Sequence, residues 1–218
     1  MMIEDNSPQT PLWVRKLLIP AALGGVVGFA AAAGMMAFLE SKSVGGLGKS
    51  ATVAALVGVV YAVIGLFMSV GVANPQLGAR FLNVEDADEL REQKRMLGLS
   101  GIAMLLWGVS FIALALAAPE GPLPAEVALA IGVGGLVAGS LLSVAVHRAS
   151  DELMRAINLE AGALSYGLVM LVAGTWAILA HLGYAAAPAP LDLLSLFYVL
   201  VLVASFITVG RRGMLAPR

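Results

Sequence analysis

The sequence contains no cysteine, few charged residues and only two histidines. Without cysteine, the chain forms no disulfide bond and offers no thiolate nucleophile, Cys-ligated zinc site or iron–sulfur cluster. Charged residues make up 12% of the 218 positions, whereas a typical soluble domain carries roughly 25%. Charge this sparse cannot cover a water-facing surface of this size. The net charge of −1 also argues against nucleic acid as a partner.

The long apolar stretches lack Asp, Glu, Lys and Arg near their centres. Such residues usually mark ion pathways and proton relays inside a membrane, so a proton- or sodium-coupled pump is disfavoured. His147 and His181 fall at opposite ends of different stretches, and we expect them to lie too far apart to share a metal or haem. No motif matches a known activity. We therefore expect no catalytic function and no cofactor.

Apolar residues make up 60% of the chain, and the mean hydropathy is +0.92. They come in blocks long enough to span a bilayer, which takes about 20 residues in a helix. We predict an all-α polytopic membrane protein, a six-helix bundle of three consecutive hairpins, with short amphipathic cytoplasmic helices. The predicted spans cover residues 17–39, 51–73, 97–118, 127–146, 161–180 and 191–210. They form one transmembrane domain, 17–210, between tails at 1–16 and 211–218.

The basic residues are distributed unevenly between the two sides of this predicted bundle. With the N-terminus in the cytoplasm, all but two of the 13 Lys and Arg residues fall in cytoplasmic segments. The two exceptions are Lys42 and Lys49. Because cytoplasmic loops carry an excess of Lys and Arg, both termini are predicted to be cytoplasmic. We expect an integral protein of a bacterial inner membrane.

Two charged segments lie on this cytoplasmic side. We predict that a helix over 84–95, capped by Asn83, runs into the third span, and that a helix capped by Ser150 runs into the fifth. Four pairs of opposite charge have helical spacing: Asp88/Arg91, Glu92/Arg95, Arg148/Glu152 and Asp151/Arg155.

The charged helices 80–95 and 147–160 form the first candidate site, a surface for a membrane or cytoplasmic protein partner. The residues assigned to partner binding are Glu85, Asp86, Asp88, Glu89, Arg91, Asp151, Glu152 and Arg155. One alternative is a solvated face whose charges pair with one another. Another is a divalent-cation site completed by His147, although the run lacks the spacing of a calcium loop.

The second candidate site binds lipid headgroups at the cytoplasmic interface, where basic side chains attract anionic lipids. It comprises Lys94, Arg95, Arg148, Arg211 and Arg212. Ordinary anchoring of the topology is the alternative explanation for these residues.

The third candidate is a ligand-binding wall made by Tyr61 and Trp107, which lie near the middle of their predicted spans. Their O–H and N–H groups need partners in a hydrocarbon environment. Candidate partners are Ser110, Ser140, Ser143 and Thr175. Packing of core aromatic residues is the alternative.

Two pairs of glycines, Gly24/Gly28 and Gly135/Gly139, have the spacing that lets helix backbones approach closely. They predict either packing within the bundle or self-association into a homo-oligomer.

Taken together, these features favour a non-catalytic structural or interaction component of a membrane complex, in contact with membrane lipids. The alternative is a carrier or binding protein for a neutral or amphipathic small molecule or lipid. An interfacial enzyme would have to use the cytoplasmic carboxylates, because the spans offer no nucleophile paired with a base.

Overall fold

The computed structural model describes residues 19–40, 47–79, 82, 84, 87–117 and 119–214. Within these ranges the secondary structure is helical, apart from one isolated bridge between Ala117 and Leu123. The helices are α1 (Ile19–Leu39), α2 (Lys49–Ala73), α3 (Pro75–Gly78), α4 (Ala87–Glu92), α5 (Lys94–Ala115), α6 (Ala125–Ala149), α7 (Glu152–His181) and α8 (Pro190–Arg211).

Five of these helices, α2, α5, α6, α7 and α8, are long and apolar enough to cross a membrane. The prediction of an all-α membrane protein is therefore confirmed. The shorter apolar part of α1, Gly24–Phe38, lies within the first predicted span, 17–39. Most predicted boundaries agree to within three residues, but α7 starts nine residues before the predicted fifth span.

The helix starts at the two charged segments differ from the prediction. Gln93 separates α4 from α5, so the predicted continuous helix is wrong at that residue. Asp151, and not Ser150, caps α7: its carboxylate accepts a hydrogen bond of 2.7 Å from the backbone N–H of Met154. Ser150 instead ends α6, where its hydroxyl donates to the carbonyl of Val146 at 2.8 Å. Asn83 lies outside the described residues.

The closest helix packing joins α2 and α5, which run antiparallel. Gly58 and Gly65 of α2 meet Gly108 and Gly101 of α5, respectively. A Cβ atom on Gly108 would lie 2.6 Å from the backbone nitrogen of Ala62 and 2.7 Å from the carbonyl oxygen of Gly58. Only glycine permits this approach, so the seven-residue spacing on both helices determines their register.

Helix α6 packs on the opposite side of α5, again through small residues. Gly135 faces Ser110, and Gly139 faces the indole of Trp107. The Gly135/Gly139 pair thus packs within the chain. By contrast, nothing within 4 Å would meet a Cβ on Gly24 or Gly28, so this pair on α1 faces open space.

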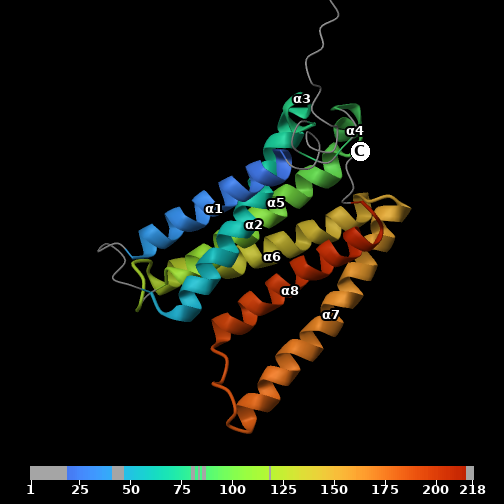
Figure 1. Cartoon of the computed structure of the whole chain (residues 1–218). Helices are drawn as coiled ribbons and strands as arrows, with labels where there is room; N and C mark the ends of the chain where they lie inside the picture. Colours follow the sequence, from blue (N-terminus) through green and yellow to red (C-terminus); the bar gives the residue numbers. More distant parts are fainter. Residues whose placement is uncertain are drawn as a thin grey trace, which may run out of the picture.

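The hairpin of α7 and α8 diverges from the body formed by α1, α2, α5 and α6 (Figure 1). It attaches mainly where α8 packs against α2. The hairpin is held at one end by Arg212, which donates to Glu160 at 2.6 and 3.0 Å. At the other end, Trp176 donates to the carbonyl of Ala186 at 2.9 Å, and α7 is terminated by Gly183 at φ +79°.

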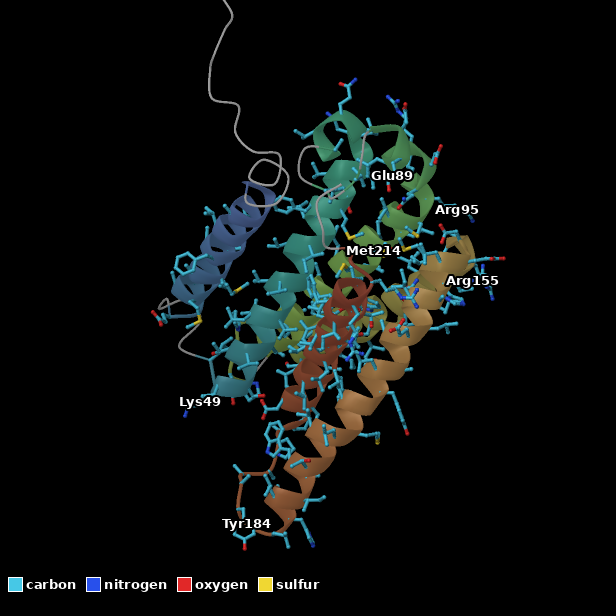
Figure 2. The ribbon with its side chains drawn as sticks, turned by 45° about the vertical axis from the view of Figure 1, so that its right-hand side comes forward. Lys49, Glu89, Arg95, Arg155, Tyr184 and Met214 are labelled. Carbon is cyan, nitrogen blue, oxygen red and sulfur yellow. The ribbon has the colours of Figure 1, made fainter. Side chains whose placement is uncertain are left out.

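The two ends of the molecule differ in composition. Glu89, Arg95 and Arg155 lie toward one end, and Lys49 and Tyr184 lie toward the other (Figure 2). The first of these is called the charged end below. It contains α4, the starts of α5 and α7, and the ends of α6 and α8.

Candidate ligand-binding cavity

A cavity of about 400 Å³ lies between the body of the molecule and the α7–α8 hairpin. Helices α5, α6, α7 and α8 provide most of its walls, and α2 contributes Tyr61. The walls consist of Tyr61, Ser100, Ala103, Met104, Trp107, Ser143, Val146, His147, Asn158, Leu159, Ala161, Gly162, Ser165, Val201, Leu202 and Ser205. The splayed hairpin thus leaves a space that the tightly packed body does not have.

The cavity occupies the half of the bundle nearer the charged end. On α5 it runs from Ser100 to Trp107, which at 1.5 Å per residue is from about 9 to about 20 Å below the start of that helix at Lys94. Its α6 wall ends at His147, two residues before that helix ends. The cavity therefore reaches from near the charged end to about the middle of the bundle.

Four aromatic rings form a cluster at the deep end of this space. Tyr198 of α8 makes edge-to-face contacts with Tyr61, Trp107 and Phe111, with ring centroids 5.4, 5.5 and 4.9 Å away. Tyr61 and Trp107 also meet edge to face at 6.0 Å. Such contacts stabilise aromatic pairs by about 0.5–1.5 kcal/mol beyond burial alone. This cluster attaches α8 to the body.

The Tyr61 hydroxyl is satisfied by the backbone and not by a serine. It donates to the carbonyl of Tyr198 at 2.9 Å, and the residue is only 1% exposed. The predicted serine partner is therefore wrong for Tyr61. Ser110 instead donates to the carbonyls of Leu106 at 2.8 Å and Ile131 at 3.2 Å, which fastens α5 to α6.

The indole of Trp107 packs against α6 at Gly139, where the missing side chain leaves room for it. Its Nε1 lies against Gly139, where even a methyl group would collide with the indole. That N–H is buried and has no hydrogen-bond partner within the described part of the chain. The predicted pairing of Trp107 with a serine is thus also wrong, although Tyr61 and Trp107 do line one cavity as expected.

The remaining polar groups on the walls are hydroxyls, one amide and one imidazole. The hydroxyls of Ser100, Ser165 and Ser205 donate to carbonyls of their own helices at 2.8–2.9 Å. Their oxygen lone pairs remain able to accept hydrogen bonds. Of the residues that the structure describes, no Asp, Glu, Lys or Arg lines the cavity. The lining suits a molecule with a neutral polar group and an apolar part.

Among these wall residues, sequence reasoning assigned only Tyr61 and Trp107 to ligand binding. It named Ser143 as a possible hydrogen-bond partner of the two and His147 only for a cation site. Asn158 was missed because it lies beside the charged start of α7, where a polar residue needs no explanation.

At 30 residues α7 is about 45 Å long, longer than the roughly 30 Å hydrocarbon core. Its charged first turns, from Glu152 to Glu160, account for part of the excess length, and tilt accommodates the rest.

The residues assigned to partner binding divide into several local roles. Asp88 and Arg91 form the predicted ion pair. Arg155 donates to the carbonyl of Ser150 at 3.3 Å. The other three predicted pairs are absent from the ion pairs of the described residues. Glu152 is exposed, and Glu85 and Asp86 lie outside the described ranges.

The two charged segments nevertheless meet in a second crevice of about 320 Å³ at the charged end. Its walls are Met68, Leu82, Val84, Glu89, Gln93, Leu97, Asp151, Leu153, Met154 and Met214. The expectation that these segments share one face is met at this crevice. Within the described ranges, no group of three or more His, Asp or Glu side chains is placed to hold a metal ion.

The five basic residues assigned to lipid headgroups do not form one site, because they lie in different surroundings. Arg212 is engaged by Glu160 at 2.6 Å. Arg95 and Arg148 line a third crevice of about 360 Å³, together with Leu141, Val144, Ala145 and Ala149. Lys94 and Arg211 are exposed and line none of the crevices described here.

The fold, with five helices long and apolar enough to cross a membrane, defines a helical membrane protein with a partly open cavity. Comparisons with protein families, curated proteins and solved structures found no match to the chain.

Proposed function

We propose that this protein binds a neutral amphipathic molecule or lipid in the cavity between its body and the α7–α8 hairpin. The protein crosses a bacterial inner membrane six times, with α1 as the first span and both termini in the cytoplasm. The charged end then faces the cytoplasm, which agrees with the concentration of Lys and Arg there. The observation that carries the proposal is a cavity of about 400 Å³ with mainly apolar walls and a few polar groups, lined by no Asp, Glu, Lys or Arg of the described residues.

The size and lining of the cavity support this proposal. Small-molecule sites are typically about 300–1,000 Å³ and combine apolar walls with a few polar groups. Here the apolar walls include Met104, Val201 and Leu202, while Asn158 and His147 supply polar groups nearer the charged end. A ligand would place its polar part near the cytoplasmic headgroups and its apolar part against the aromatic cluster.

The arrangement of α6 and α7 supports entry from the membrane. The two helices join at Ser150 and Asp151 but pack against different neighbours, α6 against α5 and α7 against α8. They diverge away from this junction (Figure 1). Because the two helices separate with distance from the cytoplasmic end, the middle of the bilayer offers a lateral route into the cavity that does not require the ligand to cross water.

Filling the cavity tests the proposal directly. Gly162 lines the cavity, and nothing within 4 Å would meet a Cβ atom there. Gly162→Leu is expected to place a side chain in the cavity while leaving the helices in position. The measurement is the shift in melting temperature of the purified protein with added monoacylglycerol or diacylglycerol. We expect the shift in the original protein and its loss in the variant.

Gly167→Leu is the matched control, because Gly167 is on the same helix, is exposed and also has open space for a Cβ. Leucine has the higher helix propensity, so both variants are expected to fold. The ligand shift is expected to persist in Gly167→Leu. Equal shifts in both variants, or no shift in the original protein with either lipid, would contradict the proposal.

A second candidate function is the docking of a partner protein at the charged end. It is favoured by the crevice that brings Glu89 and Gln93 together with Asp151 and Met154. Methionine side chains adapt to irregular surfaces and are common at protein-binding sites. The test is co-purification in mild detergent: loss of a defined partner on neutralising Glu85, Asp86, Asp88 and Glu89 supports docking, and retention of every partner counts against it.

A further inference from the structure

The crevice formed by Arg95 and Arg148 is separate from the ligand cavity. It has a volume of about 360 Å³, and its other walls, Leu141, Val144, Ala145 and Ala149, all belong to α6. Arg95 comes from the first turn of α5, and Arg148 from the last turn of α6. Two guanidinium groups from antiparallel neighbours therefore share one recess at the charged end.

The crevice and the cavity lie on opposite faces of α6. Leu141, Val144 and Arg148 follow the spacing of one helical face, and Leu141 and Val144 are 67% and 50% exposed. Ser143 and His147 line the cavity from the other face. A molecule in the crevice would consequently contact the outside of the bundle and would not compete with one in the cavity.

The charge of the crevice is not balanced by nearby acids. Among the described residues, no carboxylate lines it. Glu92 is three residues from Arg95 and Glu152 is four from Arg148, yet neither acid forms an ion pair with them in the described part of the chain. The break between α6 and α7 removes the helical relation of Arg148 to Glu152. Two positive groups thus remain available at the level of the membrane surface.

We infer that the Arg95–Arg148 crevice is a binding site for an anionic phospholipid of the cytoplasmic leaflet. The guanidinium groups hold the phosphate, since their planar donors match its oxygens. One acyl chain descends along α6 over Val144 and Leu141. The apolar wall below the charges argues for a lipid, because a free phosphate would make no use of it. Of the five basic residues assigned to lipid headgroups from the sequence, the proposed site therefore uses only Arg95 and Arg148.

The test measures the dissociation constant for phosphatidylglycerol by native mass spectrometry. A basic residue near an anionic membrane surface contributes about fivefold in affinity, and two contribute about 30-fold. Arg95→Gln and Arg148→Gln are expected to weaken binding about fivefold each, and the double variant about 30-fold. The matched controls Lys94→Gln and Arg211→Gln make the same change in charge at the same end, outside the crevice. They are expected to bind as the original protein does.

Two further arms distinguish the source of the phosphate. Ala145→Phe fills the crevice without changing any charge, and it is expected to weaken phosphatidylglycerol binding at least tenfold. Inorganic phosphate is expected not to bind at concentrations at which the lipid saturates the site. The inference is overturned if the control variants lose as much affinity as the arginine variants, if Ala145→Phe binds normally, or if inorganic phosphate occupies the site as well as the lipid does.

Discussion

Tyr61 connects three helices through one ring and one hydroxyl. It stands midway along α2, contacts Trp107 of α5 edge to face, and donates its hydroxyl hydrogen to the carbonyl of Tyr198 on α8 at 2.9 Å. In hydrocarbon that hydroxyl has few other partners, whereas the Tyr198 carbonyl lies inside α8 and also belongs to the hydrogen-bond ladder of that helix. The single bond is therefore a main polar link between the body and the hairpin.

Tyr61→Phe keeps the ring and removes this bond. We expect a loss of about 1 kcal/mol in the stability of the protein, in the range measured for hydrogen bonds in proteins and in membranes. Thermal unfolding in detergent provides the measurement. Tyr184→Phe is the control, because Tyr184 is 80% exposed, and it is expected to change nothing. A Tyr61→Phe protein as stable as the original would show that the bond is not made.

At the residue scale the sequence predicted which aromatic residues line a cavity, but not their partners. Tyr61 and Trp107 stand out because aromatic residues with polar atoms are uncommon at the middle of a span. Phe111 gave no such signal, since a phenylalanine fits any apolar helix. Tyr198 carries the same signal inside the predicted span 191–210, but it was not singled out. Their roles depend on the crossing of α8 over α2 and α5, which no local pattern specifies.

At the scale of elements, the α2–α5 contact is the most constrained part of the fold. Gly58, Gly65, Gly101 and Gly108 each lie against the opposing helix, and a Cβ on any of them would come within 2.6–2.8 Å of a neighbouring atom. The pattern was visible in the sequence as two glycine pairs seven residues apart. It was not recognised, because glycines on one helix indicate close packing only when the helix that packs against them is known.

Gly108→Ala tests this contact. The added Cβ would lie 2.6 Å from the Ala62 nitrogen, so the helices must separate, and overpacking of this kind costs about 1–3 kcal/mol. Gly98→Ala on the same helix is the matched control, because its Cβ would find Val72 at an ordinary 3.6 Å. The expected result is a lower melting temperature for Gly108→Ala and an unchanged or higher one for Gly98→Ala. The same response in both variants would contradict the close packing.

The ends of helices could be predicted where the sequence contains residues that stop a helix. Helix α2 ends at Ala73, as the predicted span 51–73 does, because Asn74 and Pro75 follow and proline cannot continue the hydrogen-bonded ladder. The predicted fifth span, 161–180, covers only the apolar part of α7, because hydropathy does not detect the polar first turns of a helix. The helix predicted to run into that span from a cap at Ser150 matches the observed start at Glu152 to within one residue. The carboxylate of Asp151 determines that start through its bond to Met154.

At the scale of the whole molecule, one part is tightly packed and the other is loosely packed. The glycine contacts hold α2, α5 and α6 as one body, whereas α7 is largely exposed along its length and packs mainly on α8. The proposed ligand cavity lies where these two parts meet. Composition alone predicted the membrane class and the helix lengths, but the splay of the hairpin depends on which faces pack, and it could not be read from hydropathy.

The central claim is that the charged end faces the cytoplasm and that the chain crosses the membrane six times. The absence of cysteine makes single-cysteine labelling with a membrane-impermeant maleimide free of background. In intact cells Glu120→Cys and Tyr184→Cys are expected to react from outside. Ser7→Cys, Arg91→Cys and Glu152→Cys are expected to react only after the membrane is permeabilised. Labelling of Glu152→Cys in intact cells, or labelling of Ser7→Cys from the side opposite to Arg91→Cys, would contradict the account.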